Sequence, residues 1–183
     1  MIENIIHDIL LAKENKAYLS ALSLALTIPS ILSSIANNKR SVRTDYAEWF
    51  NQWVYKYYKQ PKSENELINR GLEATKFDGD NCYALRCSML HAGNTDLKEN
   101  RGTIDVFVLC SSEKSSHEGD AFVCSVSENS ARDVYVSLNV VGLIDALVAG
   151  ARDYLAQNNE EVQRHQNDIK RKILFGSIDI ESS

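Results

Sequence analysis

The sequence predicts one mainly helical domain with a small antiparallel β insertion, a hairpin or a three-stranded sheet, before its last long helix. Only 8 glycines and 2 prolines occur in 183 residues, too few for the tight turns of a sandwich or barrel. Apolar residues instead recur at helical spacing through most of the chain. The content of 44% hydrophobic and 25% charged residues is typical of folded proteins, and the length favours a single domain over residues 1–183.

The first two predicted helices differ in polarity. Residues 2–13 form an amphipathic helix whose apolar face is Ile2, Ile5, Ile6, Ile9 and Leu10. A second helical region covers residues 17–36, and we expect it to kink or divide near Pro29. Its stretch from Tyr18 to Ala36 carries no charge over 19 residues, about the length that crosses a bilayer. Six hydroxyl side chains and Pro29 favour a helix buried in protein, so we expect no membrane contact.

A third helix is expected to begin at a Ser41 cap and to run through Tyr58. One face of it should pack inside the protein and consists of Tyr46, Phe50, Trp53, Val54 and Tyr57. A capping box at residues 63–66 predicts a further helix, which continues through Leu67, Leu72 and Ala74.

The next predicted helix covers residues 81–92. A loop at residues 77–80 precedes it, Asp80 or Asn81 is the expected cap, and Gly93-Asn94 ends it. The helix is apolar on nearly every side, so we expect neighbouring elements or a partner chain to bury it.

The pattern then changes to β-structure. Three short β-branched or aromatic runs, separated by polar loops, predict the antiparallel insertion: Thr103–Cys110, Ala121–Ser127 and Val134–Leu138. Helical spacing returns from Val140 to Gln157, and polar residues follow to Lys172. Residues 173–183 are expected to form a weakly ordered tail.

Charge and cysteine usage limit the classes of function. A net charge of -5 disfavours coating of nucleic acid by charge alone, so any such contact must be local. The four cysteines include no CxxC pair and the first residues do not resemble a signal peptide, which predicts reduced thiols and a cytoplasmic location. Cys82 and Cys87 are expected to be small core residues, and Cys110 and Cys124 are candidates to approach each other across the hairpin.

Arg86 and His91 are the only basic groups of the helix over residues 81–92. A buried guanidinium is costly unless it meets a counter-charge or faces a polar cleft, and the end of a helix favours protonated histidine. Two interpretations follow. The pair forms a functional site, or Arg86 makes a buried ion pair with Asp45, Glu48 or Asp78 while His91 only hydrogen-bonds at the helix end.

The spacing Arg86-x4-His91 resembles the motif of the HEPN superfamily, whose members carry Arg, four to six residues and then His on a late helix of an all-helical bundle. The surrounding string GDNCYALRCSMLHAG, residues 79–93, is similar to a form common in uncharacterised bacterial HEPN-like proteins. Upstream, residues 28–31 and the pattern Arg43-x2-Tyr46-x2-Trp49-Phe50 also resemble those proteins. The resemblance covers residues 17–93 and, more loosely, the sheet and the closing helix.

This resemblance implies a HEPN-like helical bundle that cleaves RNA without a metal or cofactor, at the interface of a homodimer. Arg86 and His91 are then the catalytic residues, and the expected substrate-positioning residues are Ser88, Cys87, Asn81 and Tyr83. It also suggests a role in bacterial defence or a toxin system, with a cognate antitoxin or regulatory protein as a candidate partner.

Helix geometry explains why two chains would be needed. Residues five apart lie about 140° apart around a straight helix, so one chain places Arg86 and His91 poorly on a single phosphate. In an isologous dimer each motif faces its mate. Arg86 can then stabilise the extra charge on pentacoordinate phosphorus, while His91 removes the ribose 2′-hydroxyl proton or protonates the leaving 5′-oxygen. DNA lacks that hydroxyl and should not be cut.

Two alternatives stay open. Active family members often carry Asn, Asp or His directly after the arginine, whereas this chain has Cys87. That departure keeps a catalytically inactive dimeric module, which binds nucleotide, RNA or a protein partner, as the second hypothesis. A helical assembly protein that uses the aromatic-rich third helix as its interaction surface is the third.

Other features carry less functional information. His7, His117 and His165 have no second ligand at metal spacing, so we expect surface histidines and no metal site. The chain has no phosphate-binding glycine loop and no Gly-x-Ser-x-Gly elbow. The best local basic patches, a solvated face or a guide for RNA, are Lys39, Arg40 and Arg43, together with Lys56, Lys59 and Lys62.

Overall fold

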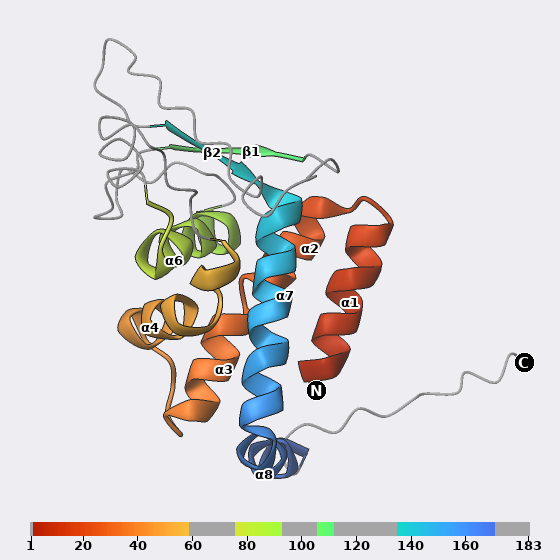
Figure 1. Ribbon diagram of the computed structural model, residues 1–183, viewed down its shortest axis with the longest axis vertical. Helices are drawn as coiled ribbons and strands as arrows, with labels where there is room; N and C mark the ends of the chain where they lie inside the picture. The colour runs from red at the N-terminus through yellow and green to blue at the C-terminus, as the bar shows by residue number, and fades with distance from the viewer. Residues whose placement is uncertain (1, 59–75, 93–105, 112–134, 171–183) are drawn as a thin grey trace, which may run out of the picture.

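The computed structural model describes residues 2–58, 76–92, 106–111 and 135–170. Its helices pack around α7 (Val140–Gln157), which runs through the middle of the molecule (Figure 1). The helices before it are α1 (Ile2–Glu14), α2 (Tyr18–Ala25), α3 (Ile28–Ala36), α4 (Arg43–Trp53) and α6 (Gly79–Cys87). The prediction of a mainly helical protein is confirmed. The predicted helix from residue 63, the run Ala121–Ser127 and the tail 173–183 lie outside the described residues.

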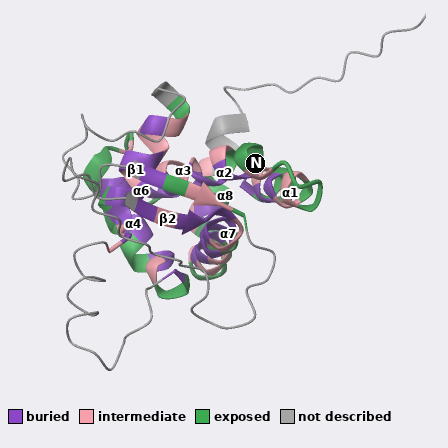
Figure 2. Cartoon of the chain, turned by 90° about the horizontal axis from the view of Figure 1, so that it is seen from above, coloured by how far each residue is buried: buried purple, intermediate pink, exposed green. Residues whose placement is uncertain are grey.

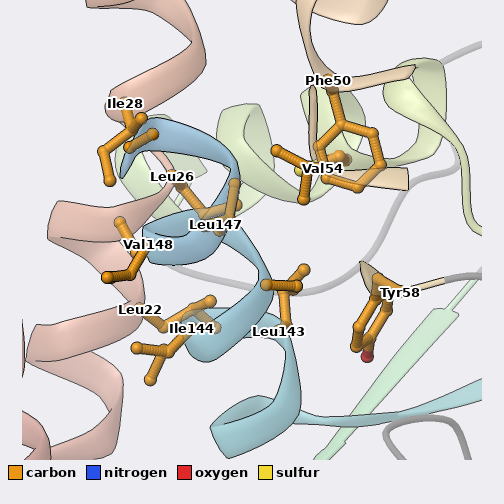
Figure 3. Close-up of a cluster of buried hydrophobic side chains, with 14 of the residues drawn as sticks. Leu22, Leu26, Ile28, Phe50, Val54, Tyr58, Leu143, Ile144, Leu147 and Val148 are labelled. Atoms are coloured by element: carbon orange, nitrogen blue, oxygen red, sulfur yellow. The ribbon is translucent and has the colours of Figure 1, made fainter. Parts of the chain in front are cut away.

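The core forms where α7 meets the helices on either side of it. Leu143, Ile144, Leu147 and Val148 of α7 are buried at helical spacing. Figure 3 shows that they face Leu22 and Leu26 of the α2 segment, Ile28 of α3 and Phe50 of α4. The Asn139 side chain caps α7, because its oxygen accepts from the Val141 N–H at 3.1 Å and the Gly142 N–H at 3.4 Å. The predicted bounds of this helix are confirmed.

The uncharged stretch Tyr18–Ala36 divides into α2 and α3, as the sequence predicts. Pro29 lies in the first turn of α3, and the Thr27 hydroxyl donates to the Leu24 carbonyl at 2.6 Å where α2 ends. Among the described residues this 19-residue stretch alone is long and apolar enough to cross a membrane, by length and composition only. Half of its most apolar window is buried inside the protein, where α2 packs on α1 and α7 and α3 packs on α4.

The start of α4 differs from the prediction of a Ser41 cap. The cap position is Val42, whose backbone is extended and whose N–H donates to the Asp45 carboxylate at 3.2 Å. The Ser41 hydroxyl is instead 2.7 Å from the Ser33 hydroxyl, in a hydrogen bond between the two. A carboxylate in the first turn satisfies the free backbone group, so the serine is not needed as a cap.

The end of α4 also differs, because the α-helix stops at Trp53 and a 3₁₀ turn covers Tyr55–Tyr57. Tyr46, Phe50, Trp53 and Val54 are buried as expected. Tyr57 is 44% exposed, so its predicted place on the buried face is wrong. The change of helical pitch turns it outward, and its hydroxyl donates to the Asp153 carboxylate at 2.6 Å.

The described strands are parallel, which corrects the predicted antiparallel hairpin. β1 (Val106–Cys110) pairs with β2 (Tyr135–Asn139), with Phe107 opposite Val136 and Leu109 opposite Leu138. A parallel pair needs a crossover of a dozen or more residues, and residues 111–134 are long enough to provide it. β2 leads directly into α7, and the strand pair lies across the end of the bundle (Figure 1). Seen from above, buried residues line the inside of the bundle and exposed ones its outer faces (Figure 2).

The sequence predicts only polar residues after Gln157, but the structure has a helix there, α8 (Asn159–Lys170). Glu160 and Glu161 lie in its first turn, where the helix dipole favours negative charge. Val162 is buried against the rest of the protein. One buried apolar residue among polar ones gives too little periodicity for α8 to be recognised.

Candidate functional site

The candidate site lies on α6, and the N-terminus of this helix is capped two or three residues earlier than predicted. Asp78, not Asp80 or Asn81, is the cap, and its carboxylate accepts from the Asn81 N–H at 3.2 Å. The Asn81 side chain is buried and donates to the Lys76 carbonyl at 2.7 Å. Asn81 therefore holds the start of the helix, and its role as a substrate-positioning residue stays a prediction.

Removal of this cap gives a first prediction. Asp78→Ala leaves the N–H of Asn81 without its acceptor and should lower the free energy of unfolding by about 1 kcal/mol. Chemical denaturation with far-UV circular dichroism measures the change. Asp80→Ala, two residues away, removes only an exposed ion pair with Arg43, so it is the matched control and should stay within about 0.5 kcal/mol. Equal losses in both variants would contradict the assignment of Asp78 as the cap.

The inner face of α6 packs on α4. The Tyr46 hydroxyl donates to the Leu26 carbonyl at 3.1 Å and lies 3.4 Å from the Cys82 sulfur. Burial raises the pKa of Cys82 to about 12, so this thiol stays protonated. Its expected role as a small core residue is confirmed, whereas Cys87 is only half-buried. The Tyr46 ring also packs edge-on against Tyr83, with centroids 5.3 Å apart.

Arg86 makes no ion pair with any described residue. Its Nε is buried and has no hydrogen-bond partner in the described part of the chain. Its guanidinium carbon lies 5.8 Å from the centre of the Tyr83 ring, within cation–π range. The side chain as a whole is only half-buried and its positive charge has no counter-charge among the described residues, so the guanidinium is available to a ligand oxygen.

The acids considered as partners for Arg86 are used elsewhere. The Asp45 carboxylate accepts from Asn37 at 2.9 Å and from Lys39 at 3.3 Å, and Asp78 caps α6. Glu48 borders a recess on another side of α4. The buried ion pair proposed as the alternative is therefore not present among the described residues.

Tyr83 and Cys87 lie one helical turn apart, beside Arg86. Burial raises the pKa of Tyr83, and a hydrogen bond with Cys87 adds to the rise, while the positive charges of Arg86 and Arg43 oppose it. Arg43 also pairs with Asp80 at 2.9 Å. Arg86, Tyr83 and Cys87 thus share one surface, with Arg43 at its edge.

A π-helical turn, Ser88–Ala92, follows α6 directly and carries His91. Such a turn joins residues five apart, so each residue advances by less than the 100° of an α-helix. The expectation of a straight helix, with Arg86 and His91 about 140° apart, is therefore wrong. The wider turn reduces the angle between their backbone positions, while the His91 side chain lies outside the described part of the structure. Ser88 is buried and Leu90 is exposed.

The remaining predicted groups give no second site. His7 is exposed on α1, His165 borders a recess with Arg164, and His117 and Cys124 lie outside the described residues. Within the described ranges no cluster of three His, Cys, Asp or Glu residues can hold a metal ion. Three of the basic residues considered as RNA guides are paired with acids: Lys39 with Asp45, Arg43 with Asp80 and Lys56 with Asp153.

Sequence reasoning missed two features near this site. The π-helical turn has no residue type that specifies it. The recess on the other side of α4 is signalled only by polar residues at positions 45, 48 and 52 beside the aromatic Trp49 and Trp53. Helical spacing of acids next to aromatics is the pattern that could have indicated it.

No family model, curated protein or solved structure matches the chain. The α6 surface and the sequence motif that it carries are therefore the features of this protein that bear on its function.

Proposed function

We propose that the protein is a metal-independent endoribonuclease that acts as a homodimer, with Arg86 and His91 as its catalytic residues. The observation that carries this proposal is that Arg86 lacks both a counter-charge and an acceptor for its buried Nε among the described residues. An unpaired guanidinium can bind a phosphate, which offers charged oxygen acceptors.

The chemistry follows from the two residue types. A ribose 2′-oxygen attacks the adjacent phosphorus, the bond from phosphorus to the 5′-oxygen breaks, and the products end in a 2′,3′-cyclic phosphate and a 5′-hydroxyl. His91 takes the proton from the 2′-hydroxyl or supplies one to the leaving 5′-oxygen. Arg86 neutralises the charge that develops on the phosphoryl oxygens.

A homodimer supports this chemistry better than one chain. The π-helical turn lowers the angle between Arg86 and His91 but does not bring the two positions onto one line of the helix surface. A symmetric partner supplies a second copy of each residue across the interface. Leu90, 37% exposed between the two catalytic positions, is an apolar residue that such an interface would cover.

The resemblance to HEPN proteins supports the same proposal and extends it to a cytoplasmic role in defence or a toxin system, with an antitoxin or regulatory protein as partner. Cys87 favours the second candidate, a catalytically inactive module that binds nucleotide, RNA or a protein. This cysteine stands directly after Arg86, where active family members often carry Asn, Asp or His, and a half-buried thiol is a poorer hydrogen-bonding group than those side chains.

Cleavage of labelled RNA in EDTA tests the enzyme against the binding module. We expect the parent protein to produce cyclic-phosphate ends and not to cleave DNA of the same sequence. Arg86→Ala and His91→Ala should each lower the rate of RNA cleavage at least about a hundredfold. Arg152→Ala, an exposed arginine on α7, is the matched control and should retain full activity. Equal residual cleavage by every variant would indicate contamination and favour the inactive module.

A further inference from the structure

A recess of about 230 Å³ lies where α3, α4, α7 and α8 meet, and the proposed ribonuclease site does not use it. Trp49, Trp53 and Tyr154 form aromatic walls, and Asp45, Glu48 and Glu161 bring carboxylates to it. The recess and the α6 surface lie on different sides of α4. Tyr46, Ala47 and Phe50 contact the α6 region, through Tyr83, Gly79 and Phe77 respectively.

The aromatic walls contain two buried polar atoms that lack partners. Trp49 is 4% exposed and Tyr154 is 3% exposed. Neither the Trp49 Nε1 nor the Tyr154 hydroxyl has a hydrogen-bond partner among the described residues. Native structures leave few buried donors unpaired, because each costs about 1–3 kcal/mol. Both atoms are donors that a neutral oxygen within hydrogen-bond distance would satisfy.

The charge of the recess selects against anions. Asp45 is already compensated, since it accepts hydrogen bonds from Asn37 and Lys39. Glu48 and Glu161 form no ion pair with any described residue, and no Lys, Arg or His lines the recess. Burial and the charge of Glu161 raise the pKa of Tyr154 to about 12, so the phenol keeps its proton as a donor.

We propose that this recess binds a basic peptide segment of a partner protein, with an arginine or lysine side chain between Glu48 and Glu161 and a neighbouring backbone carbonyl on Trp49 Nε1 or the Tyr154 hydroxyl. Uncompensated carboxylates attract the cation, and the negative faces of the aromatic rings favour it as well. A peptide supplies a cation and a neutral acceptor together, whereas a simple amine supplies only the cation and RNA brings phosphates that the carboxylates repel.

The two tryptophans of the chain both border this recess, so intrinsic fluorescence reports on it selectively. The probes are capped tripeptides with Arg, Lys, norleucine or Glu between two alanines, with n-butylammonium as a cation without a carbonyl. We expect a saturable change in tryptophan emission with the Arg and Lys peptides. The affinity for both peptides should fall as the salt concentration is raised. The norleucine and Glu peptides and n-butylammonium should bind at least about tenfold more weakly.

Variants distinguish binding at the recess from a general attraction of cations to a negatively charged protein. Glu48→Gln and Glu161→Gln should each lower the affinity for the Arg peptide about two- to fivefold. Glu160→Gln changes the preceding residue, which lies outside the recess, and should leave the affinity unchanged. Thermal unfolding establishes that each variant is folded. The proposal is wrong if no peptide gives a saturable change, if the Glu peptide or n-butylammonium binds as well as the Arg peptide, or if all three variants behave alike. These measurements need no RNA cleavage, so they stand apart from the proposed enzymatic activity.

Discussion

Gly79→Ala should destabilise the protein by about 3 kcal/mol or more, the largest stability effect that the structure predicts. A Cβ atom at Gly79 would lie 2.2 Å from the Ala47 carbonyl oxygen and 2.5 Å from the Ala47 Cα. Both atoms belong to the α4 backbone, so no side-chain rotation relieves the clash, and α4 and α6 must separate. Such a loss is a large part of the 5–15 kcal/mol that stabilises a typical domain.

Gly150→Ala is the comparison for this prediction. Its Cβ would lie 2.7 Å from the Val54 Cγ2 atom and 2.9 Å from the Trp53 carbonyl oxygen. The nearest atom belongs to a side chain, and the substitution also gains about 1 kcal/mol of helix propensity in the interior of α7. Urea unfolding should therefore rank Gly79→Ala well below Gly150→Ala in stability. The reverse order would show that α4 and α6 are not packed as closely as described.

Sequence periodicity predicts elements whose buried face is long and regular. The helix over 140–157 repeats apolar residues for five turns, so its limits follow from the pattern. The start of α4 does not follow from it, because Ser41 and Asp45 both offer acceptors near Val42. The competition between them is decided by the contact of Ser41 with Ser33, which no local rule predicts.

The direction of the strands also lies beyond a local pattern. β1 and β2 have the same β-branched and apolar character in a parallel or an antiparallel pair. The two strands are far enough apart in the sequence, from Cys110 to Tyr135, for either direction of pairing. The antiparallel prediction followed from short runs separated by polar loops, and that pattern does not fix the direction of pairing.

One part of the candidate site could be predicted from the sequence, whereas the neighbouring recess could not. A helix that is apolar all round with one arginine predicts that Arg86 is unusual, and its unpaired Nε agrees with this. The recess could not be predicted as a unit, because Trp49 and Tyr154 are far apart in the sequence and meet only through the packing of α4 on α7. Pairs of this kind depend on the tertiary fold and not on spacing along a helix.

If the protein is the proposed homodimeric ribonuclease and Arg86 and His91 act across its interface, two inactive variants should restore activity to each other. Arg86→Ala and His91→Ala alone should each lose at least about a hundredfold in rate. In a heterodimer of the two, one site lacks both residues and the other keeps an intact Arg86 from one chain and His91 from its mate. Equal mixing makes half of the dimers heterodimers, so about a quarter of the parent activity should return.

The measurement is RNA cleavage after the two variants, carrying different affinity tags, are denatured together, refolded and purified as the doubly tagged species. That species alone should reach about half of the parent rate, because one of its two sites is intact. A refolded mixture of Arg86→Ala with the double variant Arg86→Ala/His91→Ala is the matched control and should stay inactive, since no site regains Arg86. If the doubly tagged species forms but cleaves no faster than either variant, Arg86 and His91 act within one chain. The dimer would then hold the site together without sharing its residues.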